Sequence, residues 1–329
     1  MTSPFPPSES SPGEGHLSVH LLPQAISALS RITFQYPLKL ISPSPTAHQK
    51  SVLVFLLTYG GGLVGGDQVR LKIDVKPNAK LSIVTQGHTK VFKSPSRDVI
   101  TRQQLRVSIA VGAALCLLPD PVQPFGGSVY EQSQVFTLED GGSLCLLDWV
   151  SAGRTARGEN WDFGTWSGRN EIWAAVQFEQ TARLLLRDNV ILEGDISKAE
   201  DKLLKEKMHN LSIFGTLVLR GPLLEDLATF FLSEFSSLPR IGGRDFRSQE
   251  KIDNDSGITL SRTAQWRKSR LQQEKADGVL WSAAKVRGCT VVKFGAHTVE
   301  GGRNWIGSMV IEQGSIAEHF GTDSLMCLR

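Results

Sequence analysis

The chain has 329 residues, of which 40% are hydrophobic and 21% charged, and its formal net charge at pH 7 is +3. This length accommodates one large or two ordinary domains with a substantial core, and the near balance of charge argues against a nucleic-acid or membrane partner. The four cysteines form no C-x-x-C pair, so we expect reduced core cysteines in a cytosolic protein and neither a disulfide framework nor a structural zinc site.

The first residues, MTSPFPPSESSPGEG, are rich in proline, serine and glycine and lack the basic start and apolar stretch of a secretory signal. We predict a disordered tail over residues 1–17 and a single domain over residues 18–329. No apolar run approaches the roughly 20 residues that a membrane-spanning helix needs.

Glycines concentrate in the stretch TYGGGLVGGDQVRLKIDV, directly before Asp67, at Gly60, Gly61, Gly62, Gly65 and Gly66. A phosphate-binding loop would need a lysine in place of Asp67 and a helix after it, whereas an alternating, strand-like run follows here. We therefore reject nucleotide binding at this loop. We predict a side-chain-free bend that lets the backbone lie close to a neighbouring strand.

Strand–turn–strand units recur along the next part of the chain. Residues 68–76 alternate between apolar and polar side chains, which predicts a half-buried strand, and a second strand starts after a turn. In each unit an apolar residue precedes the first leucine of the second strand by six positions: Val75 and Leu81, Ile109 and Leu115, Leu138 and Leu144, Phe178 and Leu184. We predict stacked, hairpin-like units that form a β-helix-like, superposed sheet.

Stacking in register would align polar residues at one end of the second strands. Four residues after the leucines come Thr85, Pro119 with Asp120 next, Asp148 and Asp188. Carboxylates repel one another and are costly to desolvate, so such a row suggests a polar channel or a cation path. The alternative is that each residue is an exposed turn residue or a cap, because aspartate is common in turns.

Beyond residue 195 the pattern changes to a mixed α+β region. A capping box at Ser197 and Glu200 predicts a short helix, residues 211–219 are typical of a buried strand, and helical apolar spacing begins at Leu223. Residues 242–278 are polar, and we predict a surface insertion there. A strand over 286–296 and a packed helix over 304–320 would complete a mainly β fold with two or three helices in its C-terminal half.

Two further groups of residues each allow two interpretations. His88 is the histidine nearest the glycine loop in sequence, either as a hydrogen-bonding loop residue or as a metal ligand. Arg154, Arg157 and Glu159 lie among tryptophans and glycines, where they would form an ion-pair network or a docking surface.

Several motifs together carry a family likeness. QYPLKLISP at 35–43, GGGLVGGD at 60–67, TQGHTKVFKS at 85–94, LPDPVQPF at 118–125 and LDWVSAGRTARGE at 147–159 follow one another in an order that resembles the urease accessory protein UreD, also called UreH. The resemblance covers residues 18–235 well and the C-terminal third loosely. The N-terminal tail and the polar insertion favour a eukaryotic, fungal-like member.

The resemblance implies a cytoplasmic, β-rich scaffold that is not an enzyme. Such a protein would bind urease apoprotein and, with UreF and the GTPase UreG, assist the insertion of nickel into urease. Nickel would pass through the chain in transit, no cofactor would be held tightly, and GTP would bind only to a partner.

By motif, the resemblance assigns candidate residues to a transient nickel path: Asp67, Asp148 and Glu159, with Thr85 and Asp120. Oxygen ligands bind such an ion weakly enough to release it, which a histidine and cysteine cage does not. The remaining motif residues would have structural or docking roles: Gly61, Gly62, Gly65, Gly66, Lys90, Arg154 and Arg157.

Two other functions stay open at the level of sequence. One is a β-helical or β-sandwich carbohydrate-active hydrolase that uses Asp120 and Asp148, which would need an aromatic-lined cleft and carboxyl groups about 5–10 Å apart. The other is an interaction module without an ion path. A hydrolase screen on the purified chain would decide the first alternative, and a continuous polar tunnel would separate the conduit from the interaction module.

Overall fold

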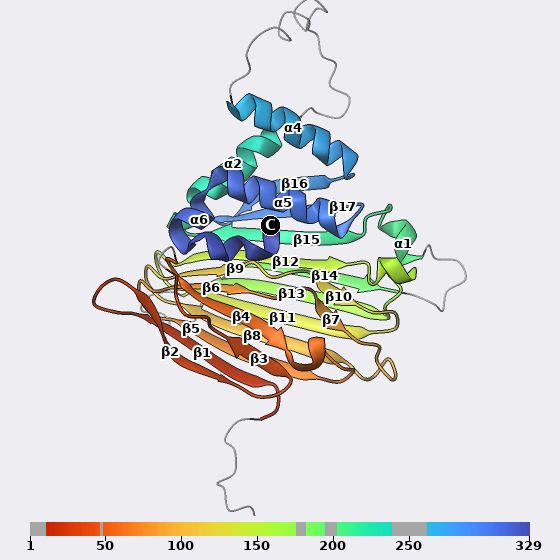
Figure 1. Cartoon of the computed structure of the whole chain (residues 1–329), viewed down its shortest axis with the longest axis horizontal. Coiled ribbons are helices and arrows are strands. Elements are labelled where there is room, and N and C mark those ends of the chain that lie inside the picture. Colours follow the sequence, from red (N-terminus) through yellow and green to blue (C-terminus); the bar gives the residue numbers. More distant parts are fainter. Residues whose placement is uncertain (1–10, 47–48, 176–181, 195–202, 239–261) are drawn as a thin grey trace, which may run out of the picture.

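Two stacked β-sheets and a layer of helices make up the molecule (Figure 1). The computed structural model describes residues 11–46, 49–175, 182–194, 203–238 and 262–329. The predicted mainly β class, with a few helices toward the C-terminal end, is confirmed.

Sheet A has seven strands, of which the inner five run parallel to one another and the two edge strands run antiparallel. In spatial order they are β14 (Arg183–Glu193), β13 (Thr165–Ala174), β11 (Val129–Leu138), β8 (Thr101–Ile109), β5 (Gln68–Val75), β1 (Glu14–Leu21) and β2 (Ser27–Phe34).

Sheet B has ten strands, with four parallel strands in its centre and antiparallel strands toward both edges. In spatial order they are β16 (Leu280–Val286), β17 (Cys289–Ala296), β15 (Ile213–Arg220), β12 (Ser143–Ser151), β9 (Ala114–Leu117), β6 (Lys80–Val84), β4 (Val52–Thr58) and β3 (Leu38–Ile41). Two short strands, β7 (Thr89–Val91) and β10 (Val122–Pro124), pair beside β12.

The predicted strand–turn–strand units are present, but the two strands of a unit do not pair with each other. The turn after β5 carries the chain from sheet A to β6 in sheet B, and β8–β9 and β11–β12 do the same. Matching residues of successive units are register partners: Val75, Ile109 and Leu138 in sheet A, and Leu81, Leu115 and Leu144 in sheet B. The stacking register was therefore predicted correctly, whereas each predicted hairpin turn is a corner between two sheets.

The fourth predicted unit ends this coil. Strands β13 and β14 form an antiparallel pair within sheet A, with Trp173 opposite Leu184, and Phe178 lies outside the described residues. Strand β15 then extends sheet B antiparallel to β12. The parallel stack therefore stops at β12 and β13, and antiparallel strands finish both sheets.

Two apolar cores hold the layers together. Inward-facing residues of the two sheets, such as Ile73 and Phe136 from sheet A and Leu146 from sheet B, form the larger core. The outer face of sheet B packs against the helices in a second core that includes Phe231 and Trp305. All four cysteines are buried and unpaired.

Four of the described helices gather over the β15–β17 end of sheet B (Figure 1): α2 (Glu225–Ser236), α4 (Arg262–Ala276), α5 (Val299–Gln313) and α6 (Ser315–Phe320). The short α1 (Leu204–Lys207) lies apart from them, and its Leu204 joins the inter-sheet core. The 3-10 segments are η1 (Tyr59–Gly61), η2 (Thr155–Arg157), η3 (Pro222–Leu224) and η4 (Thr322–Leu328). None of these helices in the described ranges is long and apolar enough to cross a membrane.

Two predicted elements have different boundaries. The strand expected over 286–296 is a hairpin, because Arg287 and Gly288 both have positive φ and form a tight turn between β16 and β17. The helix expected over 304–320 begins earlier, where the Thr298 hydroxyl caps the backbone N–H of Gly301, and it is interrupted at Gly314, whose φ is +89°.

The N-terminal boundary also moves. Strand β1 begins at Glu14 and pairs in parallel with β5, so residues 14–17 belong to the fold and not to the predicted tail. Leu17 and Val19 alternate into the inter-sheet core, which fixes this strand. Residues 1–10 lie outside the described residues.

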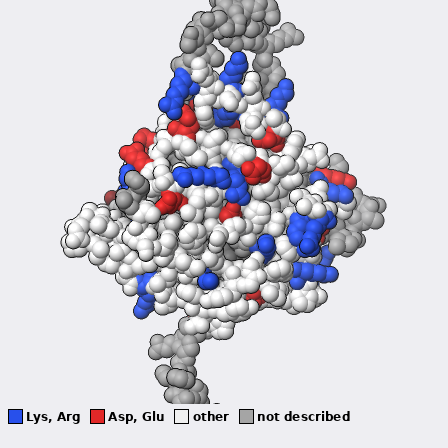
Figure 2. Space-filling model, in the orientation of Figure 1, with Lys and Arg blue, Asp and Glu red and all other residues white. Residues whose placement is uncertain are grey.

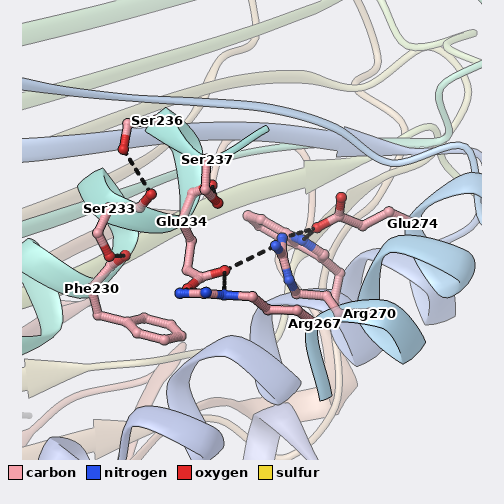
Figure 3. Close-up of polar contacts among 9 residues, drawn as sticks. Phe230, Ser233, Glu234, Ser236, Ser237, Arg267, Arg270 and Glu274 are labelled. Atoms are coloured by element: carbon pink, nitrogen blue, oxygen red, sulfur yellow. Dashed lines mark hydrogen bonds and ion pairs between the residues drawn. The ribbon is translucent and has the colours of Figure 1, made fainter. Parts of the chain in front are cut away.

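Part of the predicted polar insertion is a packed helix. Helix α4 docks through charge, because its buried residues are Arg270 and Glu274 (Figure 3). Arg270 donates to the carboxylates of Glu274 and of Glu234 on α2, and Arg267 donates to Glu234 as well. The Trp305 indole N–H donates to Glu274 at 2.8 Å. An ion-pair network thus replaces the apolar stripe expected of a docked helix.

Candidate functional site

The polar residues singled out by spacing lie in one row across sheet B. Because β6, β9 and β12 stack in register, Thr85, Pro119 and Asp148 follow equivalent positions of neighbouring strands. The row continues on the other side, where Thr216 of β15 is opposite Asp148 and Lys293 of β17 is opposite Thr216. The predicted alignment is therefore present, and its members are mostly buried rather than exposed turn residues.

Asp148 is at the centre of this row and is 8% exposed. Its carboxylate points between the sheets, where Oδ1 accepts from the Gln132 amide at 2.8 Å and Oδ2 from the Asn170 amide at 2.6 Å. Burial raises the pKa of Asp148, and the two amide hydrogen bonds only partly oppose that shift. Among the described residues Asp148 has no ion-pair partner, so it is a buried carboxylate held by neutral donors.

One end of the row is at Asp120, which is 5% exposed. Its Oδ2 accepts from the Thr85 hydroxyl at 3.0 Å and from the Gly87 backbone N–H at 2.9 Å, and its Oδ1 is 3.0 Å from Nη1 of Arg303. This carboxylate faces an outer pocket of about 580 Å³. The pocket is lined by Phe55, Thr85, Gln86, Gly87, His88, Lys90, Asp120, Arg303, Met326 and Cys327.

Two groups of the outer pocket have shifted pKa values, in both cases mainly through burial. Burial lowers the pKa of His88, so its imidazole is the more readily neutral. Burial raises the pKa of the Cys327 thiol to about 12, which keeps it protonated. The oxygen atoms of Asp120 are therefore the anionic ligands of this pocket.

A small inner cavity of about 30 Å³ lies between the sheets, next to the outer pocket. Thr85 and Asp120 line both spaces, while Gln132, Gln134 and Asp148 line the inner one. A space of this size holds one or two water molecules. The Thr85–Asp120 pair is therefore the partition between an exposed polar pocket and a buried polar cavity.

The other end of the row is at Asp188 on β14. Its carboxylate accepts from Lys293 Nζ at 2.7 Å and from the Thr216 hydroxyl at 3.2 Å. Asp188 is the register partner of Asn170, which donates to Asp148. The Lys293 side chain is 37% exposed, so this end reaches solvent.

We name the set of polar side chains from Asp120 to Asp188 the polar belt. Direct hydrogen bonds link its members in three groups: Thr85 with Asp120; Gln132, Gln134, Asp148 and Asn170; and Thr216 with Asp188. Each end holds a carboxylate paired with a cation, and the middle holds a carboxylate without one. No group of three or more His, Cys, Asp or Glu side chains in the described ranges could hold a metal ion. The arrangement offers successive single oxygen ligands, which suit brief contacts with a cation and not its storage.

Asp67 lies outside the belt, beside the glycine loop. Its carboxylate accepts from the Val64 backbone N–H at 2.8 Å, which closes a local turn. A Cβ on Gly62 would lie 2.8 Å from the Lys90 carbonyl oxygen, so glycine lets this segment lie against β7. Lys90, at the other side of that contact, lines the outer pocket.

The other glycines for which a structural role was predicted act on the loop itself. A Cβ on Gly65 would lie 2.7 Å from Pro95, and the Gly66 N–H donates to the Thr101 hydroxyl at 3.1 Å. Gly61 has a φ of +75° with open space around it. The loop therefore shapes the wall behind β7 and carries no ligand of its own.

Glu159 lies outside the belt as well. It accepts from the Arg154 guanidinium and backbone N–H, and Arg154 stacks 3.9 Å above the centre of the Phe125 ring. Hydrogen bonds from Arg154 lower the pKa of Glu159. This pair ties together two loops, whereas Arg157 is exposed in the 3-10 turn η2.

Sequence reasoning missed the amides and cations of the belt. Gln132 and Gln134 interrupt an inward-facing apolar alternation in β11 between Tyr130 and Phe136, which is a detectable signal for a polar site. Arg303 and Lys293 come from the C-terminal region, far from their partners in sequence, and no local pattern marks them.

The structure also bears on the hydrolase alternative. The inner cavity, which Asp120 and Asp148 both line, is far too small for a sugar ring. A hollow of about 1600 Å³ is on the outer face of sheet A, and neither residue lines it. On the face displayed in Figure 2, basic and acidic side chains are interspersed, without a continuous field of one sign.

The fold is a β-helix-like stack of two sheets that encloses a row of buried polar side chains. The chain belongs to the UreD urease accessory protein family, whose profile matches residues 11–320. It is 35% identical to a ureD-like urease accessory protein of Schizosaccharomyces pombe over 87% of this chain and 89% of that one. It is 33% identical to urease accessory protein 4 of Cryptococcus neoformans, covering 68% and 76% of the two chains. Urease accessory protein D of Arabidopsis thaliana is 33% identical over 59% and 63%.

Proposed function

We propose that this chain is a scaffold for urease maturation and that its polar belt conducts nickel toward the urease active site. The buried carboxylate of Asp148 carries the proposal, because it is held by two neutral amides and no cation of the described residues contacts it. A buried carboxylate without a cation is costly, and an incoming cation would offset that cost.

The dimensions of the belt suit transfer in steps. Neighbouring strands lie about 4.8 Å apart, so the row from Thr85 on β6 to Lys293 on β17 extends for about 20 Å. Along it, the amides turn their N–H groups toward Asp148, while hydroxyl and carboxylate oxygens recur at Thr85 and Asp120, at Asp148, and at Thr216 and Asp188. Such ligands bind Ni²⁺ weakly enough that it is released to the next position.

The nickel path keeps three of the residues expected from sequence, namely Thr85, Asp120 and Asp148, and adds Asp188. Asp67 and Glu159 would support the walls of the path, since their carboxylates are engaged in local turns and ion pairs. Lys90 and Arg157 are exposed and available for docking.

The partners in this proposal are urease apoprotein, UreF and the GTPase UreG, and nickel is cargo, not a resident cofactor. GTP would act through UreG only. We place the chain in the cytoplasm, because its four unpaired cysteines suit a reducing compartment. The chain itself would turn over no substrate.

The conduit is tested by nickel loading of urease in a reconstituted system with the partner proteins. Asp148→Asn should lower both the nickel content of urease, by metal analysis, and the urease activity. Glu171→Gln is the matched control, because Glu171 is similarly buried but pairs with Arg187 outside the belt. Normal nickel loading with a folded Asp148→Asn chain would refute the conduit.

The scaffold role is tested separately by affinity capture. The chain is used as bait in cells that contain urease and its accessory proteins, and it should recover these proteins. The amount recovered should differ between samples with and without GTP. Recovery of neither urease nor any accessory protein would refute the scaffold role.

A further inference from the structure

Both ends of the polar belt carry a cation that belongs to the protein. At the pocket end, Arg303 Nη1 is 3.0 Å from Asp120 Oδ1 and donates to the Cys327 carbonyl at 2.9 Å. At the other end, Lys293 Nζ is 2.7 Å and 3.0 Å from the two oxygens of Asp188. Arg303 and Lys293 therefore occupy the positions at which a cation would contact these carboxylates.

A cation that moves between the outer pocket and the inner cavity has to pass Asp120, because Asp120 and Thr85 line both. Both oxygens of that carboxylate have partners, Arg303 on one and Thr85 and Gly87 on the other. A divalent ion beside a bound guanidinium would meet like charge at short range, which is strongly unfavourable away from water. Metal contact at Asp120 therefore requires Arg303 to move.

We propose that Arg303 and Lys293 are gating counter-cations, which neutralise Asp120 and Asp188 in the absence of metal and must swing away for a cation to enter or leave the belt. This inference rests on the proposed conduit and assigns its two gates. Asp148, between them, has no such counter-cation in the part of the chain that the structure describes, and it is the site between the gates at which a cation would stop.

Each gate has a nearby place to receive the displaced cation. Arg303 is on α5 one turn after Glu300, whose carboxylate is 4.0 Å from the Arg303 Nε and 74% exposed. Movement toward Glu300 would carry the guanidinium to solvent without leaving it unpaired. Lys293 lies 5.5 Å from the centre of the Phe214 ring, which offers a cation–π contact outside the carboxylate.

The test is Ni²⁺ binding to the full-length, untagged chain, measured by equilibrium dialysis at pH 7.5. Removing a resident cation leaves a carboxylate free for metal, so Arg303→Gln should bind Ni²⁺ about tenfold more tightly than the wild type or better. The added substitution Asp120→Asn should abolish this gain, and Arg303→Lys, which keeps the charge, should show none. Lys293→Gln should give the same gain, abolished by Asp188→Asn.

The double substitution Arg169→Gln and Arg187→Gln is the matched control, because it removes both arginines from a buried carboxylate, Glu171, that is not on the belt. Equal Ni²⁺ affinity of Arg303→Gln and the wild type would overturn the Arg303 gate. A gain that survives Asp120→Asn, or that this double control variant reproduces, would do the same. The more exposed Lys293 supplies an independent pair of variants if Arg303→Gln does not fold.

Different measurements test the gates and the conduit: Ni²⁺ affinity of the chain tests the gates, and nickel loading of urease tests the conduit. If the gating variants gain Ni²⁺ as expected but urease is loaded normally with Asp148→Asn, the counter-cations stand and the conduit is refuted. If Ni²⁺ affinity is unchanged while Asp148→Asn blocks loading, the conduit stands and the gates are refuted.

Discussion

Helix α4 should depend on one buried carboxylate for its attachment. Glu234 on α2 is 1% exposed and accepts from both Arg267 and Arg270 on α4, as Figure 3 shows. The substitution Glu234→Gln keeps the volume and removes the charge. It leaves Arg270, which is 3% exposed, with Glu274 as its remaining ion-pair partner among the described residues.

The expected loss of stability in Glu234→Gln follows from the burial of the ion pair. Removing one member of a buried ion pair costs about 3–5 kcal/mol, because the other charge stays desolvated. Arg267→Gln breaks a contact to the same carboxylate from a side chain that is 45% exposed, and such contacts contribute about 0.2–1 kcal/mol. At roughly 2 °C per kcal/mol for a chain of this size, Glu234→Gln should lower the Tm by roughly 6–10 °C.

Thermal unfolding of the two variants compares these costs, and amide hydrogen exchange locates them. If α4 opens locally before the whole chain unfolds, its amides should exchange much faster in Glu234→Gln while those of β12 keep their protection. The reasoning is refuted if Glu234→Gln and Arg267→Gln lower the Tm equally and leave the exchange of α4 unchanged.

The glycine loop, the belt and the thiols each give a further prediction. Gly62→Ala should lower the free energy of unfolding in urea by about 1–3 kcal/mol, because its Cβ would clash with the Lys90 carbonyl. Gly60→Ala, with open space around it and a φ of +70°, should lower it by about 1 kcal/mol. Equal losses in the two variants would exclude the steric explanation. Burial raises the pKa of Asp148 above 3.8, so the native chain holds the carboxyl proton more tightly than the unfolded chain does. The stability of the wild type relative to Asp148→Asn should therefore fall as pH rises from 3.8 through the native pKa. A stability difference that does not change with pH would contradict this. Burial raises the pKa of Cys327 to about 12, and all four cysteines are buried, so iodoacetamide at pH 8 should label none within minutes in the native chain and all four in urea, as mass spectrometry would count.

The stacking of the strands was predictable because a coil that repeats its turn also repeats its register. The constant offset from Val75 to Leu81 and from Ile109 to Leu115 placed each apolar residue at the same corner, and pairing in two sheets preserves this offset. The polar row follows from the same geometry, which is why residue spacing alone aligns Thr85 with Asp148. Whether a turn is a hairpin or a corner depends on which strands pair, and side-chain alternation does not encode that choice.

Helix α4 and the gates escaped prediction for a different reason. Apolar periodicity detects helices that dock through a hydrophobic face, but α4 docks through Arg270 and Glu274, so its sequence resembles a solvated segment. The partners of Asp120 and Asp188 come from strands and helices that only the tertiary fold brings together. Asp67 and Glu159 show the converse, since motif likeness grouped them with Asp148 while the fold gives them local partners.

Asp148 distinguishes a conduit from a merely structural polar core. If the inward amides of Gln132 and Asn170 needed only an acceptor, an asparagine or glutamine at position 148 would supply one without the cost of burying a charge. The carboxylate adds a negative charge, and no side chain among the described residues neutralises it by direct contact, although Arg303 and Lys293 neutralise the carboxylates on either side. In the proposed conduit, a buried carboxylate that has no cationic partner among the described residues, placed between two carboxylates that have one, would attract a cation from outside the chain.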